Sequence, residues 1–156
     1  MILVCAATGT EAAACRRGIA DAGAGDVEVM VTGVGPSRAA TALGRRLGER
    51  RPSLVVSSGF AGALGAGVEP LSWVTASALY RLDGERAARV VLPPGLLRVA
   101  DGATPCHLVT AGRVVASAID GVPPPVTVDM ESSALAEAAA AADVPFAVLR
   151  LVTDVP

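Results

Sequence analysis

The chain has 156 residues, a length that suits one domain with a substantial core. Hydrophobic residues make up 52% of it and aromatic residues 3%, so the core is aliphatic, and the net charge of -2 without a basic stripe argues against nucleic-acid binding. No apolar run reaches the ~18–20 residues of a membrane span, and the N-terminus lacks the basic region of a signal peptide.

The first third of the chain alternates apolar runs with helical segments. Ile2–Ala6 is a continuous apolar run, as expected of a strand that is buried on both faces. A helix is expected over Glu11–Ala22, followed by an alternating strand over Val27–Val31. Pro36 or Ser37 then opens a helix that runs to about Glu49, and Leu54–Ser57 is the next strand.

The middle of the chain is less regular. Residues 58–65 (SGFAGALG) are small and predict a loop, and residues 68–80 predict one or two strands. Residues 81–105 are rich in Arg, Pro and Gly and indicate no clear element. Residues 107–115 predict a further strand, and Pro123–Pro125 forms a stiff connector.

A strand–helix–strand unit closes the chain. Val126–Val128 leads into an Ala-rich helix, and Phe146–Leu151 is the second apolar strand. Such a crossover predicts that the two strands are parallel. Together with the preceding segments, it predicts an α/β fold: a three-layer αβα domain with a mostly parallel mixed central sheet.

Three acidic residues that follow predicted strands are the candidate functional residues. Glu11 follows the first strand, Glu131 follows Val126–Val128, and Asp154 ends the last strand. Open α/β sheets bind ligands at the carboxyl ends of their strands, so these acids are expected to meet at a small-molecule site. Taken singly, Glu11 and Glu131 are also explained as acids that complement a helix dipole.

Two other motifs give weaker signals. Gly33-x-Gly35 lacks the third glycine of a dinucleotide-binding loop because position 38 is Arg, so the glycines are interpreted as turn residues or as points of close backbone approach. The segment 58–62 is not a nucleophile elbow, because its serine is not central. The lone His107 has no convincing Ser and Asp partners for a triad, which favours a structural role.

The cysteines indicate the compartment and argue against a metal site. Cys5, Cys15 and Cys106 are odd in number and form no C-x-x-C motif, which predicts reduced thiols in a cytoplasmic protein. No grouping of His, Cys, Asp and Glu has the spacing of metal ligands. We therefore expect no metal.

Four segments carry a family resemblance: ILVCAATGTEAAA, VTGVGPSRAATAL, VVSSGFAGALGAGVEP and VDMESSALAEAAAAADVPFAVLRLVTD. In this order they resemble the nucleoside phosphorylase/nucleosidase superfamily, and especially methylthioadenosine/S-adenosylhomocysteine nucleosidases, futalosine hydrolases and hopanoid-associated phosphorylases. The D-M-E-S run that begins at Asp129 and the R-x-x-T-D run that ends at Asp154 are the specific parts. The glycine turns are weak alone.

The resemblance implies a role for each of the three acids. Asp154 would be the general acid that protonates N7 of a purine, and Glu11 would deprotonate the attacking water. Glu131 would accept hydrogen bonds from the ribose hydroxyls. Further residues would form the substrate pocket: Met130 under the sugar, Thr153 beside Asp154, Val114 and Val115 at the base, and Ser58, Gly59 and Phe60 in the floor.

The implied reaction is hydrolysis of a purine-type nucleoside without a cofactor. Phosphorolytic relatives hold phosphate with arginines, one of them just before the glycine loop, whereas this strand has Leu54–Ser58 there. Water is therefore the expected nucleophile, and Arg38 is the residue that argues for phosphate. Phosphorolysis and non-catalytic nucleoside binding by a truncated relative stay open as alternatives.

The resemblance also bears on domain organisation and assembly. It implies that residues 1–156 form a single phosphorylase-like domain without the C-terminal helix with which relatives continue. Relatives form homodimers in which the partner closes the 5′ side of the pocket, and the same assembly is expected here. Expected binding partners are a small-molecule nucleoside and a second copy of the chain, with no nucleic acid and no membrane.

Overall fold

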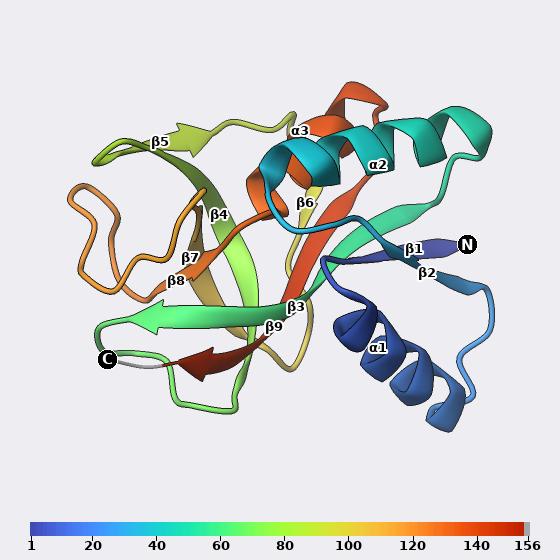
Figure 1. Ribbon diagram of the computed structural model, residues 1–156, viewed down its shortest axis with the longest axis horizontal. Coiled ribbons are helices and arrows are strands. Elements are labelled where there is room, and N and C mark those ends of the chain that lie inside the picture. The colour runs from blue at the N-terminus through green and yellow to red at the C-terminus, as the bar shows by residue number, and fades with distance from the viewer. Residues whose placement is uncertain (155–156) are drawn as a thin grey trace.

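The computed structural model describes residues 1–154, which form a mixed β-sheet with helices on both of its faces (Figure 1). The strands are β1 (Ile2–Ala6), β2 (Val27–Val31), β3 (Leu54–Leu64), β4 (Trp73–Asp83), β5 (Arg86–Val90), β6 (Leu97–Arg98), β7 (Thr104–Thr110), β8 (Val126–Asp129) and β9 (Phe146–Asp154). The helices are α1 (Gly9–Asp21), α2 (Pro36–Glu49) and α3 (Ser132–Ala141). Helix α1 covers one face, and α2 and α3 lie together on the other (Figure 1). The predicted α/β class is confirmed.

Local sequence signals explain the first elements. The apolar strand β1 lies between β2 and β3 and is parallel to both. Helix α1 begins with a capping box, in which the Thr8 side chain accepts from the Glu11 backbone and the Glu11 side chain accepts from the Thr8 backbone. Pro36 opens α2 as its fixed φ favours. The bounds predicted for β2 and α2 are confirmed.

The strands beyond this region close into a circuit. Strand β3 pairs with β8, and the order continues through β7 and β4 to β9, which pairs with β3 again. Strands β1 and β2 continue the sheet from the first half of β3 and are outside this circuit, with β2 as the edge strand. Most pairings are parallel, but β3–β8, β4–β5 and β4–β9 are antiparallel. The sheet is therefore mixed and mostly parallel, as predicted.

Residues 58–65 are not the loop that their composition predicted. Strand β3 continues through this segment to Leu64, because Val55 to Gly62 pair with β9 and Gly62 to Leu64 pair with β8. Glycine and alanine have low strand propensity, but backbone pairing on both sides overrides that preference. This extension forms one wall of the candidate site.

Two further strand predictions are wrong. Strands β8 and β9 are not parallel to each other, because β8 runs antiparallel to β3 and β9 runs parallel to it, on opposite sides of β3. The crossover rule applies to strands of one open sheet, whereas here the sheet closes. The strand predicted over residues 107–115 is β7, which ends at Thr110, so the next residues belong to the connection to β8.

The main core lies between the sheet and helices α2 and α3. Leu3, Leu43, Leu135 and Phe146 are fully or almost fully buried in it. Among the helices of residues 1–154, none is both long and apolar enough to cross a lipid bilayer.

Candidate active site

A cavity of about 450 Å³, here called the central cavity, opens beside the second half of β3. Most of the residues predicted for the site line it: Glu11, Phe60, Val114, Val115, Met130, Glu131, Thr153 and Asp154. Ser58 and Gly59 are not part of this lining. The three candidate carboxylates therefore share one cavity.

Strand β3 explains why residues so distant in sequence meet. Gly62 pairs with Val128 on one side and with Asp154 on the other. The end of β8, with the residues that follow it, and the end of β9 are thus brought together across β3. Glu11 reaches the same strand from α1, because its Oε1 accepts a hydrogen bond from the Phe60 backbone N–H at 3.1 Å.

The Glu11 carboxylate is held firmly in place. Its Oε2 accepts from the Thr8 backbone N–H at 2.9 Å and from the Thr8 hydroxyl at 2.8 Å. Together with Phe60, these donors engage both carboxylate oxygens, and the residue is 8% exposed. The acid at the start of α1 is therefore both a helix cap and a side chain of the central cavity.

Glu131 directly precedes α3, and its carboxylate reaches the N-terminal end of α2, where backbone dipoles favour a negative charge. Its Oε1 accepts from the Gly35 backbone N–H at 3.0 Å, and its Oε2 lies 3.4 Å from Nη2 of Arg150. Burial nevertheless raises the pKa of Glu131 above its ordinary value, and the charges of Asp129 and Glu11 act in the same direction. The Gly33-x-Gly35 turn thus serves a close backbone approach.

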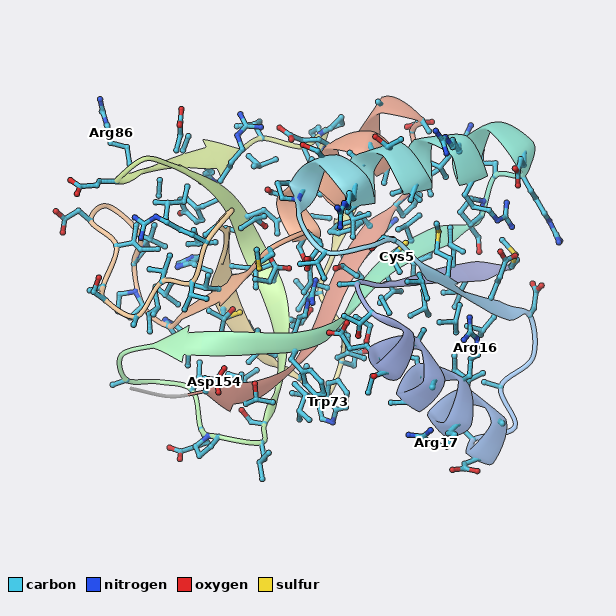
Figure 2. The ribbon with its side chains drawn as sticks, viewed as in Figure 1. Cys5, Arg16, Arg17, Trp73, Arg86 and Asp154 are labelled. Atoms are coloured by element: carbon cyan, nitrogen blue, oxygen red, sulfur yellow. The ribbon has the colours of Figure 1, made fainter. Side chains whose placement is uncertain are left out.

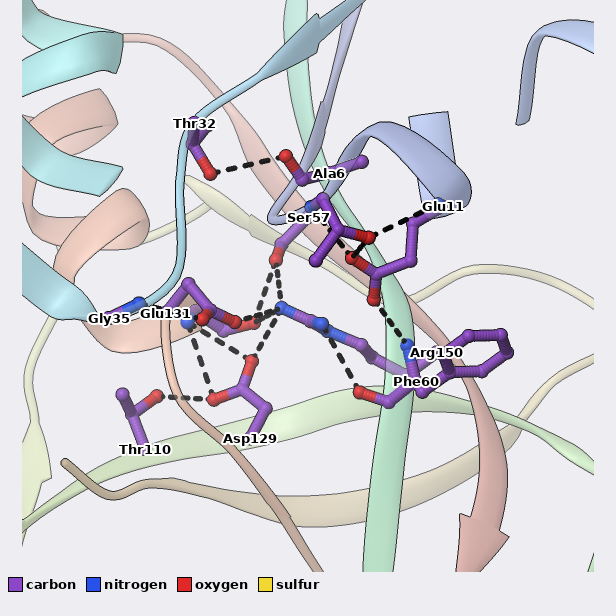
Figure 3. A network of polar contacts seen from close by, with 12 residues as sticks. Ala6, Glu11, Thr32, Gly35, Ser57, Phe60, Thr110, Asp129, Glu131 and Arg150 are labelled. Atoms are coloured by element: carbon purple, nitrogen blue, oxygen red, sulfur yellow. Dashed lines mark hydrogen bonds and ion pairs between the residues drawn. The ribbon is translucent and has the colours of Figure 1, made fainter. Parts of the chain in front are cut away.

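Arg150 and Asp129 form a buried ion pair that the sequence interpretation had not assigned (Figure 3). Nη2 of Arg150 lies 2.8 Å from Oδ2 of Asp129 and donates to the Ser57 hydroxyl at 2.9 Å. Asp129 also accepts from the Thr110 hydroxyl at 2.7 Å. Both residues belong to the D-M-E-S and R-x-x-T-D motifs, and the single arginine in an apolar strand was the available signal.

Thr153 and Asp154 are exposed at the end of β9, and Figure 2 shows the position of Asp154. Within residues 1–154, the Asp154 carboxyl has no hydrogen-bond partner, so the expected support by Thr153 is not a hydrogen bond. Val114 is 87% exposed at the cavity rim. The Asp154 and Val114 end of the central cavity is therefore more open than its buried Glu11 and Glu131 end.

Gly59 supports the site from behind the Glu11 carboxylate. Its φ is +145°, and a Cβ at this position would lie 2.3 Å from Oε1 of Glu11 and 2.9 Å from Nη1 of Arg150. The neighbouring Ser58 accepts a weak hydrogen bond from the Cys15 thiol at 3.7 Å. Gly59 is therefore required by the packing of two charged side chains.

Gly59→Ala is expected to lower the free energy of unfolding by about 2–4 kcal/mol, through the clash and the unfavourable φ. Gly44→Ala is the matched control, because Gly44 is in the middle of α2 with no atom within 4 Å of an added Cβ. That control is expected to stabilise the protein by roughly 0.5–1 kcal/mol. Urea unfolding of both variants measures the difference, and equal stability would contradict the packing argument.

The remaining candidate side chains concern a possible metal site and the single histidine. Among residues 1–154, no group of three or more His, Cys, Asp and Glu side chains is arranged to hold a metal ion. His107 packs edge-on against Tyr80, with ring centroids 5.9 Å apart, and does not line the central cavity.

Solved structures of nucleosidases share this fold. A 5′-methylthioadenosine/S-adenosylhomocysteine nucleosidase from Colwellia psychrerythraea, in complex with adenine, matches with a TM-score of 0.79 and 19% identity over 99% of this chain and 82% of its own. The same type of enzyme from S. pneumoniae matches with a TM-score of 0.77 and 21% identity over 98% and 85%. Futalosine hydrolase from Helicobacter pylori matches with a TM-score of 0.74 and 14% identity over 98% and 87%.

Sequence comparison gives the family. A search of curated proteins found no match. The family model described as the phosphorylase superfamily matches residues 7–116, which include Glu11, the Gly33-x-Gly35 turn and the whole of β3. Since this match spans most of the chain and the fold agrees with it, the chain belongs to the phosphorylase superfamily.

Proposed function

We propose that the protein hydrolyses the N-glycosidic bond of a purine-type nucleoside and releases the free base and the sugar. The observation that carries the proposal is the meeting of Glu11, Glu131 and Asp154, from three separate elements, around one cavity of about 450 Å³. This volume lies in the range of small-molecule sites. Nucleosidases of the same fold lend the proposal further support.

Each carboxyl group has a distinct task in this reaction. Cleavage passes through a sugar with oxocarbenium character, which requires an acid at the leaving base and a base on the attacking water. Asp154 donates the proton to N7 of the purine, and Glu11 removes a proton from the water. Glu131 holds the sugar hydroxyls, with Met130 packed against the sugar, and its negative charge favours the developing positive charge.

Water is the proposed nucleophile because the central cavity offers little to hold phosphate. Four carboxylates and two guanidinium groups line it, so the lining is negative overall. Arg150 is 2% exposed and is already bound to Asp129 and Ser57. Its remaining Nε–H is buried and has no partner within residues 1–154, so Arg150 presents no open two-donor face to phosphate.

An assay of base release tests the proposal. The protein is incubated with methylthioadenosine, S-adenosylhomocysteine, futalosine and inosine, each with and without phosphate, and the free base is measured by chromatography. Release without phosphate from at least one substrate is expected. Release that requires phosphate would establish the phosphorylase alternative, and no release from any substrate would overturn the proposed activity.

The pH dependence of activity is expected to report the charge of Glu131. Since burial raises the pKa of Glu131, the acid limb of kcat/KM lies above the usual range of a glutamate. Asp129→Asn removes a neighbouring negative charge that raises this pKa, so the limb moves to lower pH. A pH profile of both proteins measures the shift, and an unmoved limb would show that Glu131 does not control it.

We also propose a cytoplasmic homodimer. Phe60 on β3, Leu151 on β9 and Trp73 on β4 are in register across the sheet, which places their side chains in one row. Phe60 and Trp73 are each 48% exposed, and Phe60 lines the central cavity. A second copy that packs on this row would bury it beside the site, and sedimentation velocity measures the assembly.

The proposed cytoplasmic location is supported by the three free cysteines, which suit a reducing compartment.

A further inference from the structure

A second hollow, of about 280 Å³, adjoins the central cavity along the connection between β7 and β8. It is called the outer hollow here, and it shares Arg113, Val115 and Ala116 with the central cavity. These residues therefore form a wall that both spaces share. A side chain in this wall can reach a ligand in the central cavity from the solvent side.

Strand β3 shows which end of a nucleoside would face this wall. The Phe60 backbone N–H donates a hydrogen bond to Glu11, and Gly62 pairs with Asp154. Leu64 belongs to a buried apolar cluster against which Val115 packs. From Phe60 to Leu64 the strand advances about 13 Å. A sugar at the Glu11 and Glu131 end, with its base beside Asp154, therefore directs the far edge of the base toward Arg113 and Val115.

Arg113 is chemically distinct from the rest of this wall. It is the single cation among the residues that line the outer hollow, and no hydrogen bond or ion pair within residues 1–154 holds its guanidinium. Its neighbours Val114, Val115 and Ala116 are apolar. Polar recognition of the base edge by a side chain of this wall thus depends on Arg113.

We propose that Arg113 is a specificity-determining residue that favours a base with a carbonyl on its far edge, as in a 6-oxopurine, over a 6-aminopurine. The proposal rests on the proposed function, which sets the direction of the base. A guanidinium only donates hydrogen bonds, so it matches a carbonyl oxygen and opposes an amino group. Glu85 and Asp120 line the outer hollow and disfavour an acidic substituent, which leaves the neutral carbonyl as the match.

Inosine and adenosine test the proposal because their bases differ in a carbonyl or an amino group at position 6. Wild-type protein is expected to prefer inosine in kcat/KM. Arg113→Met keeps an unbranched apolar stem but removes the guanidinium and its donors, and it is expected to lower the inosine-to-adenosine ratio about tenfold. Arg17→Met, on the exposed face of α1 far from Asp154, is the matched control and leaves the ratio unchanged (Figure 2).

Binding of the free bases separates this inference from the proposed activity. Calorimetry with hypoxanthine and adenine is expected to show tighter binding of hypoxanthine, and this preference is lost in Arg113→Met. That result would support the inference even if no nucleoside were cleaved. An equal loss for both bases in Arg113→Met, an adenine preference in wild-type protein, or binding of neither base would overturn it.

Discussion

Asp154→Asn is expected to reduce kcat for base release by about 10²–10⁴-fold, with a much smaller change in KM. Asparagine keeps the size of the side chain and can form hydrogen bonds, but it cannot transfer a proton to the leaving base. The loss therefore belongs to the chemical step rather than to binding of the nucleoside. Steady-state kinetics with the best substrate of the base-release assay measures both constants.

The exposed position of Asp154 separates an effect on activity from an effect on stability. The residue is exposed at the end of β9, so its replacement is expected to change the free energy of unfolding by less than about 0.5 kcal/mol. Asp101→Asn is the matched control, since Asp101 is exposed and does not line the central cavity. Full activity of Asp154→Asn would exclude it as the general acid, and an equal loss in both variants would point to an unspecific effect.

Arg150→Met is expected to lower the free energy of unfolding by about 3–5 kcal/mol, because it leaves Asp129 buried without its cation. The cost depends on pH. Arg150 lowers the pKa of Glu131 against the effect of burial, so its removal raises that pKa further. A carboxyl whose pKa is raised in the folded state destabilises the protein when it is ionised. The deficit of Arg150→Met therefore shrinks as the pH falls and Glu131 takes up a proton.

A double variant separates the lost charge pair from lost packing. Arg150→Met with Asp129→Asn removes both charges of the pair, and it is expected to recover a large part of the stability that Arg150→Met loses. Urea unfolding at neutral and acid pH measures the single and double variants. A double variant as unstable as the sum of the two single variants would mean that Arg150 stabilises the fold through packing alone.

The elements that the sequence predicted well are those with a strong local signal. Strand β1 is a continuous apolar run, and Pro36 after a glycine turn marks the start of α2. The fold class followed from the alternation of such segments. The second half of β3 was missed because Gly59, Ala61 and Gly62 have no preference for a strand. This segment is nevertheless a strand because its backbone pairs with β8 and β9.

The candidate site divides in the same way. Glu11, Glu131 and Asp154 were predicted from their positions after strands, and they share the central cavity. The reason for their meeting was different from the expected one, because β8 and β9 are not parallel neighbours. A close backbone approach at Gly33-x-Gly35 was among the interpretations, but its partner Glu131 was not identified. Asp129 was given no role, since no local pattern shows that an aspartate pairs with a distant arginine.

The amino-acid sequence by itself determined which residues can carry proton chemistry and which short segments become helices or buried strands, since both depend on neighbours along the chain. The tertiary structure alone decided that β3 closes the sheet, that Arg150 is buried against Asp129 and Glu131, and that Arg113 is part of the wall between two hollows. These features depend on contacts between residues far apart in sequence, whose partners no local pattern specifies.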